Sequence, residues 1–550
     1  MVKQITSRHW PTWHTVLLAG IFLAALLLLT WDIAAPFVRQ GSYDEIIYTL
    51  HASAYDRYGL VETRLALVYP AGDLAAPLTD TDHHASRSVL LTILLTVIYK
   101  SLGYHEWAGR LIGIASTLVS LLALHSIAKR LWTKRIALIA TLVMALTPSM
   151  VIFGRETWTV PPQIACWLVA IYLYVRWFQT EGPFNLWGMA VCLTLGILFS
   201  PWSGLFLPPF IALHGLIFGH KHRWRILAWS GGAGLVAMLL FAAHLTWLGP
   251  VAWQDLFERV ALRAGVSGVD TSPSIAVWLA KMGWRISGWN TPVATLLGIL
   301  VLAVATRRII KQREATLSDQ ILIILAAAGL TILLVFPQLA WVHHYVSVFV
   351  VPYLSVASAL AIDALLTQVP HHKLALIGVI ALTLGWLGSS VAMINIQSQY
   401  RLRELDVFVQ LDQFLQPGDR VLVAGEVPFT FQFYFRHPWT RVELDDYEWD
   451  MEARSNQHNL GLIFFQPDSP VETQAASLAS QFPSGRVDTD PPLSPSFFIV
   501  QLNERTKEIP ALVTKLNNIP ERNPPNRLET LIQETRKQVE IQLGIRTRLD

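Results

Sequence analysis

The chain has 550 residues, of which 53% are hydrophobic and only 15% are charged, and its mean hydropathy is +0.41. A soluble chain carries about 25% charged residues, so this composition excludes an ordinary water-soluble protein and indicates a polytopic membrane protein. The formal net charge of +3 is too small to indicate a polyanionic partner, and no basic segment is interleaved with aromatic residues, so no nucleic acid is expected to bind.

Eleven apolar runs are predicted to cross the membrane, because a hydrocarbon core of ~30 Å needs about 20 helical residues. The first run has no small-residue cleavage site after it and is interpreted as a retained span, not a signal peptide. The runs cover residues 14–34, 108–125, 136–153, 160–177, 186–199, 205–218, 226–248, 292–305, 321–340, 346–366 and 374–394.

Lysine and arginine positions set the expected orientation. If the further apolar run 89–104 lies along the membrane surface, the basic clusters near residues 3–8, 129–135, 221–225, 307–313 and 373 all fall on one side. We therefore expect a multi-pass plasma-membrane protein with a cytoplasmic N-terminus. Residues 37–106, residues 251–290 and everything after Gln397 are expected outside.

The first external loop opens with two adjacent acids, Asp44 and Glu45. One interpretation is a capping box, in which Ser42 caps a helix and Glu45 reaches back to its amide. Adjacent residues on a helix point about 100° apart, so the two acids cannot serve one cap. Asp44 shares a helical stripe with His51 and two tyrosines, and that stripe is the alternative, a polar site.

Further motifs follow in a fixed order after the acidic pair. They are a histidine-bearing segment at 82–87, Glu-x-x-x-Arg-Leu at 106–111, Thr-Pro-x(5)-Gly-Arg at 147–155, and Trp-Val-His-His-Tyr at 341–345 followed by Val-Pro-Tyr at 351–353. Together with the pair, this order resembles the membrane glycosyltransferases of the C superfamily. It is most similar to glycosyltransferase family 39, which includes protein O-mannosyltransferases and the aminoarabinose transferase that modifies lipid A.

The resemblance implies an all-α polytopic membrane domain of about eleven spans with interfacial helices, followed by a small C-terminal α/β domain. It implies transfer of a sugar from a polyprenyl-phosphate donor to a hydroxyl of an external lipid, glycan or protein, beside membrane lipid. Asp44 is the implied general base, with Glu45 beside it as a second catalytic residue. The candidate residues for the donor phosphate and sugar are His83, His84, Arg110, Arg155, Glu156, His343, His344 and Tyr345.

This sequence departs from the family pattern at two places. The segment 82–87 lacks the family's prolines, and Val160 stands where many members have an aspartate, for which Glu156 is the candidate replacement. Simpler interpretations also stay open. Arg110 and Arg155 can be interface anchors, the histidine pair 343–344 can cap a span, and the pair 83–84 can lie in a surface loop.

No cofactor is expected. Adjacent histidines seldom ligate one metal ion and no third ligand is evident, so we expect a metal-independent enzyme. A sugar on a polyprenyl phosphate is already activated, so a base and cationic groups suffice for its transfer.

The second external loop, 251–290, is rich in tryptophan, arginine and lysine on helical segments. One interpretation is an amphipathic interface helix. The other is a lid over the site, which stacks on the sugar and binds the lipid phosphate through Lys281 or Arg285. The basic and aromatic residues of the loop are Trp253, Arg259, Arg263, Lys281, Trp284, Arg285 and Trp289.

The composition changes after the last span. Residues 1–396 are predicted to form the transmembrane domain, 397–516 an external α/β domain, and 517–550 a proline-rich linker and a terminal helix. Short strands are expected at 421–424, 460–465 and 497–500 and helices at 402–415 and 471–482, without a nucleotide-binding glycine motif.

A different class of function remains open. A multi-span transporter or flippase of a lipid-linked or small polar solute would carry charges or breaks near mid-span in two related halves. Here the charged candidates cluster at one predicted rim, which favours the transferase.

Overall fold

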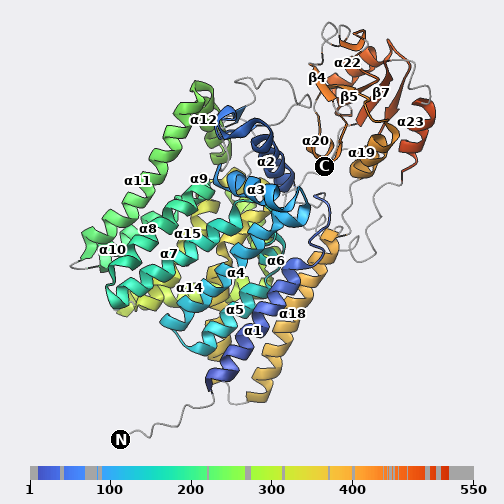
Figure 1. Cartoon of the computed structure of the whole chain (residues 1–550). Helices are drawn as coiled ribbons and strands as arrows, with labels where there is room; N and C mark the ends of the chain where they lie inside the picture. The colour runs from blue at the N-terminus through green and yellow to red at the C-terminus, as the bar shows by residue number, and fades with distance from the viewer. Residues whose placement is uncertain are drawn as a thin grey trace, which may run out of the picture.

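A computed structural model describes residues 10–37, 43–68, 83–84, 89–219, 222–266, 274–312, 316–368, 372–398 and 403–519, the last range with gaps at 426, 438, 443, 445–448, 450–451, 456, 468, 490–495 and 503–508. A bundle of long helices carries the smaller C-terminal domain at one end (Figure 1). The predicted proline-rich linker after Ile519 and the predicted terminal helix lie outside the described residues.

The bundle contains helices at every predicted span. Its elements are α1 (Trp10–Thr30), α2 (Tyr43–Glu62), α3 (Val89–Leu102), α4 (Glu106–Leu131), α5 (Lys134–Leu146), α6 (Pro148–Phe153), α7 (Val160–Thr180), α8 (Pro183–Phe199), α9 (Pro201–Gly204), α10 (Leu207–Phe218), α11 (Arg223–Leu248), α12 (Pro250–Ala264), α13 (Ile275–Asn290), α14 (Pro292–Gln312), α15 (Leu317–Val335), α16 (Pro337–Val342), the 3₁₀ helix η3 (His344–Val350), α17 (Val351–Gln368) and α18 (His372–Ser398).

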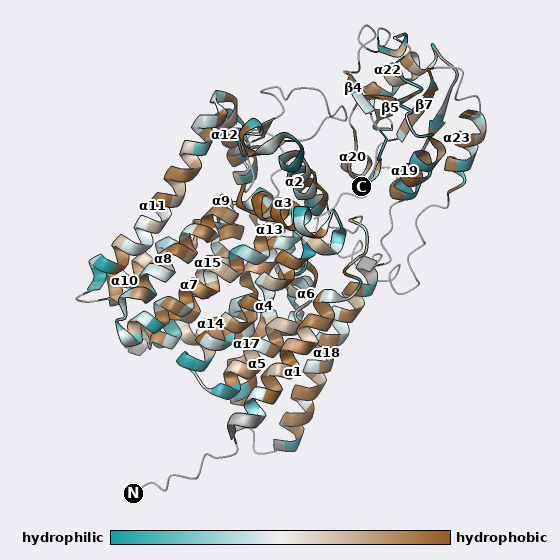
Figure 2. Ribbon diagram, in the orientation of Figure 1, coloured by the Kyte–Doolittle hydropathy of each residue, from teal (hydrophilic) through white to brown (hydrophobic). Residues whose placement is uncertain are grey.

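Eight helical stretches of the described chain are long and apolar enough to cross a membrane. They correspond to α1, α4, α9 with α10, α11, α14, α15, η3 with α17, and α18. The other three predicted runs form α5, α7 and α8. Hydrophobic residues dominate along these helices, whereas hydrophilic residues gather near the ends of the bundle and over the C-terminal domain (Figure 2). The all-helical membrane domain is thus confirmed.

Proline sets where several helices begin. It occupies one of the first two positions of α6, α7, α8, α9, α12 and α16. Proline suits these positions because the first amides of a helix have no partner within it and the fixed φ matches the helical value. The breaks before α7, α9 and η3 place irregular backbone at one end of the bundle, where side chains from several helices converge.

The apolar run 89–104 forms α3, a 14-residue helix that packs on α2 at this same end. Buried Leu91 and Leu95 belong to the bundle core. A two-residue strand β2 (His83–His84) pairs antiparallel with β1 (Leu67–Val68), which fixes the backbone between α2 and α3.

The C-terminal domain has a five-stranded sheet in the order β4-β3-β5-β7-β6. The first three strands in this order are parallel, and β7 pairs antiparallel with both β5 and β6. The strands are β3 (Val421–Gly425), β4 (Trp439–Val442), β5 (Leu460–Phe465), β6 (Ser484–Val487) and β7 (Ser496–Gln501), and the helices are α19 (Arg403–Phe414), α20 (Phe429–Tyr434), α22 (Pro470–Ala479) and α23 (Ile509–Asn517).

Alternation along the strands builds a core on each face of the sheet. On β3, Val421 and Val423 face α19, α20 and α23, whereas Leu422 and Ala424 face α22. The predicted strands correspond to β3, β5 and β7 and the predicted helices to α19 and α22. The edge strands β4 and β6 and the short helices α20 and α23 were not predicted, because each is short and lacks a long apolar run.

Candidate active site

Asp44, in the first turn of α2, lines a cavity of about 100 Å³ at the end of the bundle. Tyr48, one helical turn further on, lines the same cavity, so this part of the predicted polar stripe faces a site. The rest of the stripe is buried in packing: His51 Nδ1 bonds to the backbone oxygen of Val68 at 2.8 Å, and Tyr55 is fully buried.

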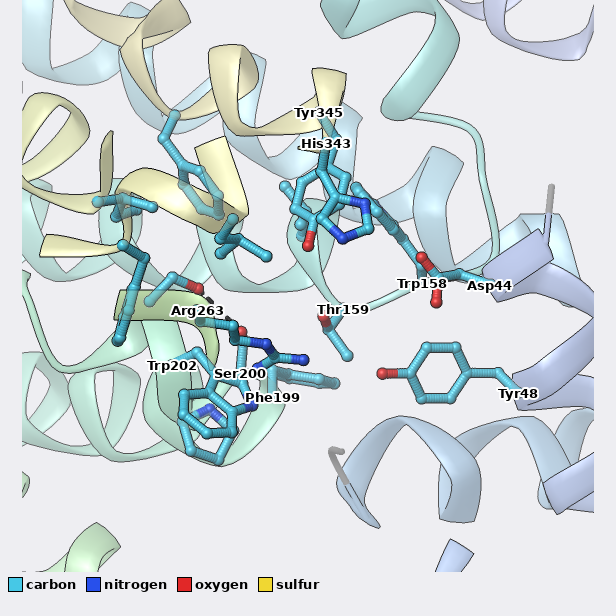
Figure 3. Close-up of a pocket in the computed structure, with 17 residues that line it drawn as sticks. Asp44, Tyr48, Trp158, Thr159, Phe199, Ser200, Trp202, Arg263, His343 and Tyr345 are labelled. Atoms are coloured by element: carbon cyan, nitrogen blue, oxygen red, sulfur yellow. Dashed lines mark hydrogen bonds between the residues drawn. The ribbon is translucent and has the colours of Figure 1, made fainter. Parts of the chain in front are cut away.

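Six segments far apart in the chain form the cavity wall, and Figure 3 shows how their side chains converge. Asp44 and Tyr48 lie on one side of the cavity and Arg263 with Trp202 on the opposite side. The lining residues are Asp44, Tyr48, Trp158, Thr159, Val160, Phe199, Ser200, Pro201, Trp202, Ser203, Arg263, Ile332, Phe336, Leu339, His343, Tyr345 and Phe349.

Glu45 has different surroundings from those of Asp44. Its Oε1 accepts hydrogen bonds from Arg110 Nε at 3.1 Å and from the backbone amide of Thr157 at 3.0 Å, and its Oε2 accepts from Arg110 Nη2 at 2.9 Å. Glu45 and Arg110 are each only 1% exposed. The carboxylate thus ties α2 to α4 and to the loop before α7; Ser42, the partner in the capping-box interpretation, lies outside the described residues.

The hydrogen bonds of Arg110 lie within the fold and not at the cavity. Besides its two bonds to Glu45, its Nη1 donates to the backbone oxygens of Ile33 at 2.7 Å and of Ala35 at 2.5 Å. Four of its hydrogen-bonding directions are therefore used within the fold, and it is not among the described residues that line the cavity. Its partners make it a structural arginine that fixes the segment after α1.

Arg155 is held in a similar way. It is almost fully buried, its Nη1 donates to the backbone oxygen of Trp31 at 2.6 Å, and it is absent from the described cavity wall. A glycine on α4 lets the loop that carries it approach closely: a Cβ on Gly113 would lie 2.5 Å from the Glu156 backbone oxygen. The interface-anchor interpretation also differs from this arrangement, because a snorkelling arginine reaches toward water.

Glu156 lies buried beside the same charges. Burial, and then the nearby carboxylate of Glu45, raise the pKa of Glu156 well above its usual value, against the opposing effects of Arg155 and Arg110. With Glu156 protonated, the charges of Asp44 and Glu45 balance those of Arg110 and Arg155. The raised pKa favours the neutral form of Glu156, which is not among the described residues that line the cavity.

The histidine segment divides between the cavity and the core. His343 and Tyr345 line the cavity, with their ring centroids 5.1 Å apart, and Tyr345 meets Trp158 edge-on at 4.2 Å. His344 contacts Trp289 instead, at a centroid distance of 5.7 Å. The other predicted histidines, His83 and His84, form strand β2, and only their backbone lies among the described features.

The loop 251–290 contributes Arg263, which the sequence did not single out as a site residue. Arg263 lies in the last turn of α12, reaches the cavity and lies over the Trp202 ring at 4.2 Å. Lys281 and Arg285 are the residues of the lid that are predicted to bind phosphate. Neither is among the described residues that line the cavity. Lys281 Nζ lies 3.5 Å from the Trp341 ring centroid, and buried Arg285 donates to the backbone oxygens of Ala340 and Val342.

The wall formed by the start of α9 was also missed. Ser200 and Ser203 are 2.8 Å apart through their hydroxyl oxygens, and Ser203 donates to Gln163 Oε1 at 2.5 Å. Polar residues around Pro201, directly after an apolar run, are the sequence feature that points to this helix break. Hydroxyls on an otherwise aromatic wall are suited to bind a polyhydroxylated ligand.

Comparison with known proteins agrees with this arrangement. Residues 86–247 match the family model described as dolichyl-phosphate-mannose-protein mannosyltransferase. No curated protein matches the chain.

Solved structures share the fold over most of the chain. ArnT from Cupriavidus metallidurans bound to undecaprenyl phosphate has a TM-score of 0.63 and 14% identity, with 89% of this chain and 98% of that chain covered. ArnT in the apo state has a TM-score of 0.59 with the same identity and coverage. An Archaeoglobus fulgidus oligosaccharyltransferase tethered with an acceptor peptide has a TM-score of 0.54 and 12% identity, with 90% of this chain and 74% of that chain covered. These matches confirm the fold and the resemblance to the C-superfamily membrane glycosyltransferases.

Proposed function

We propose that this protein is a membrane glycosyltransferase that moves a sugar from a polyprenyl-phosphate donor to an acceptor hydroxyl, with Asp44 as the general base. The observation that carries the proposal is the cavity in which Asp44 and Arg263 lie on opposite sides. A base and a cation separated by a small cavity match the two demands of the reaction, which are to take a proton from one oxygen and to stabilise charge on another.

The transfer is a single displacement at the anomeric carbon of the sugar. Asp44 takes the proton of the acceptor hydroxyl while the oxygen of that hydroxyl attacks C1. The bond between C1 and the phosphate oxygen breaks. The electron pair of that bond leaves with the polyprenyl phosphate. Arg263 is the proposed partner of the developing phosphate charge because a guanidinium binds phosphate through two parallel hydrogen bonds.

His343 is a second candidate partner for the leaving phosphate, because its ring lines the cavity. The hydroxyls of Tyr48, Thr159 and Ser200 line it as well and are the proposed contacts of the sugar. Tyr345, held edge-on against Trp158, adds aromatic surface on which a sugar ring can pack.

A second, apolar cavity supports a lipid-linked donor. It has a volume of about 390 Å³ and is lined by Leu65, Val89, Leu90, Ile93, Leu198, Pro201, Leu240, Phe241, Ala243, His244 and Trp247. Pro201 lines both cavities, so the apolar one lies next to the polar one. We propose that it holds the first isoprenoid units of the donor, whose burial is favoured at about 25 cal/mol per Å².

Reconstitution in proteoliposomes tests this function. The protein is given a panel of polyprenyl-phosphate sugars with lipid, glycan and protein acceptors, and both sugar transfer and free polyprenyl phosphate are measured. Donor-dependent transfer that Asp44→Asn abolishes is the expected result. Movement of donor between leaflets without release of polyprenyl phosphate would instead identify the transporter or flippase alternative.

The scheme needs no metal, and transfer is expected to persist in excess EDTA. It also needs the cavity on the external side of a plasma membrane, the orientation inferred from lysines and arginines. A reporter fused after Gln397 is expected outside, and one fused after Arg313 in the cytoplasm. A cytoplasmic result for the first fusion would overturn this orientation.

A further inference from the structure

Helix α20 of the C-terminal domain contacts the segment that carries the two acids. The helix is only six residues long and lies on the side of its domain that faces α2 (Figure 1). Phe431 and Phe435 point into the domain core, where their rings stack at 4.3 Å. Phe433 and Tyr434 therefore lie on the other face of α20, toward the membrane domain.

The Tyr434 hydroxyl joins the two domains. It accepts a hydrogen bond from the backbone amide of Phe37 at 2.8 Å and donates one to Glu106 Oε1 at 3.1 Å. Burial and the nearby Glu106 carboxylate raise the pKa of Tyr434, so the phenol keeps the proton that it donates. Phe433 adds an aromatic contact to Phe37, at a centroid distance of 5.5 Å.

Phe37 in turn supports the buried ion pair. Its ring lies 5.0 Å from the Arg110 guanidinium and packs with Ile46 and Leu50 of α2. A guanidinium over an aromatic face gains electrostatic attraction that grows with burial. The contacts thus form a continuous chain from Tyr434 to Phe37, then to Arg110, and then to Glu45, the residue next to Asp44.

We propose that the C-terminal domain positions the catalytic segment, with Phe433 and Tyr434 holding Phe37 and, through Arg110 and Glu45, the first turn of α2. In this role Tyr434 is a positioning residue, because it does not line the cavity among the described residues. The effect on turnover rests on the proposed function of Asp44, whereas the mechanical coupling between the domains does not.

Amide hydrogen exchange of the full-length protein in nanodiscs tests the coupling without any substrate. Tyr434→Phe and the double change Phe433→Ala with Tyr434→Phe are compared with the wild type. The control is Thr440→Val, which removes a 3.1 Å hydrogen bond to His458 within the same domain. Exchange in peptides covering residues 43–62 is expected to rise about 3- to 10-fold in Tyr434→Phe, the range for one lost hydrogen bond, and more in the double variant.

The control is expected to leave exchange in those peptides unchanged. Wild-type exchange in α2 of the double variant would overturn the proposal. A rise of equal size throughout both domains would do the same, because it would show general destabilisation.

Turnover on the active donor provides the second measurement. Tyr434→Phe is expected to lower kcat about 3- to 10-fold while the KM for the donor stays within about 2-fold. Faster exchange in α2 with wild-type kcat would contradict the positioning role. If no donor is turned over by the wild type, the function proposed above fails, and the exchange measurement alone decides the coupling.

Discussion

The two acids that open α2 are neighbours in sequence but face different regions of the molecule. Asp44 faces a cavity bounded by hydroxyls, aromatic rings and Arg263. Glu45 faces a closed cluster, in which Arg110 and the Thr157 amide occupy its oxygens. A general base must reach a substrate, whereas hydrogen bonds on both oxygens of a carboxylate fix its orientation. This difference supports the proposal that Asp44 takes part in the chemistry and that Glu45 positions it.

The closed cluster explains how the open site keeps its shape. A buried ion pair adds little net stability, because removing two charges from water costs about as much as their attraction returns. Its bidentate geometry does fix direction, since both guanidinium bonds hold only in one orientation. Glu45 thus fixes the rotation of α2 about its axis, and that rotation aims Asp44 into the cavity.

The largest effect is expected on turnover, from a change to Asp44 in the cavity wall. Asp44→Asn keeps the size of the side chain but cannot take a proton, so turnover is expected to fall about 10²- to 10⁴-fold with little loss of folded protein. The measurement is kcat on the donor identified in the panel, together with thermal unfolding of the same preparation.

Glu45→Gln is the matched control for Asp44→Asn. Glutamine keeps an acceptor for Arg110 or Thr157 but loses the charge, so this variant is expected to lose less turnover and more stability than Asp44→Asn. Wild-type turnover in Asp44→Asn would show that Asp44 is not the general base. Equal inactivation of both variants at equal stability would show that the two acids do not differ in role.

The second largest effect is expected on stability, from a change to Arg110 in the closed cluster. Arg110→Ala leaves Glu45 buried without its partner, which is expected to destabilise the protein by about 3 to 5 kcal/mol. Thermal unfolding in detergent measures this. The double variant Arg110→Met with Glu45→Gln is expected to recover part of the loss because it removes both charges.

Donor binding separates this role from the phosphate clamp that the sequence predicted. Folded Arg110→Ala is expected to bind undecaprenyl phosphate within about 3-fold of the wild type, because Arg110 does not reach the described cavity wall. A selective loss of lipid binding with unchanged stability would restore Arg110 as a phosphate ligand.

A smaller effect is expected at the opposite side of the cavity. Arg263→Ala is expected to weaken undecaprenyl phosphate binding by about 1.5 to 3 kcal/mol, the range for a hydrogen bond to a charged group. Arg259→Ala, one turn earlier on α12, is the control, since its guanidinium pairs with Asp255 at 2.7 Å. Equal affinities of the two variants, measured in nanodiscs, would exclude Arg263 as the phosphate partner.

The fold was predictable from the sequence for a simple physical reason. Each span needs enough consecutive apolar residues to cross the membrane, and that requirement is local. The α/β character of the C-terminal domain also follows from local patterns, since β3 and β5 are short buried runs bounded by turn residues. The edge strand β4 could not be predicted, because only pairing with β3 stabilises its four residues.

The site was predictable only in part. Asp44 stood out because it follows the first span directly. The resemblance at 106–111 implies a donor contact for Arg110, and the sequence does not reveal its partner Glu45, which lies 65 positions away. Arg263 was missed because the helix that carries it has the pattern of an ordinary interface helix, and the cavity that it faces exists only when distant segments meet.

The smallest expected effect comes from a change to Glu156, which is buried beside the closed cluster, and this effect depends on pH. The pKa of Glu156 is raised in the folded protein, by burial and by Glu45 before other causes, so the folded state holds a proton that the unfolded chain releases near its usual value of 4.5. The stabilising contribution of this group is therefore full below about pH 4.5 and is lost as the pH rises through the raised value.

Glu156→Gln imitates the protonated form at every pH. Its melting temperature relative to the wild type is thus expected to rise between about pH 5 and pH 9, while turnover at neutral pH changes by no more than about 2-fold. Differential scanning fluorimetry across this range checks the trend. A melting-temperature difference that stays constant with pH would show that Glu156 titrates normally, and the balance of Asp44 and Glu45 against Arg110 and Arg155 would then need another compensating group.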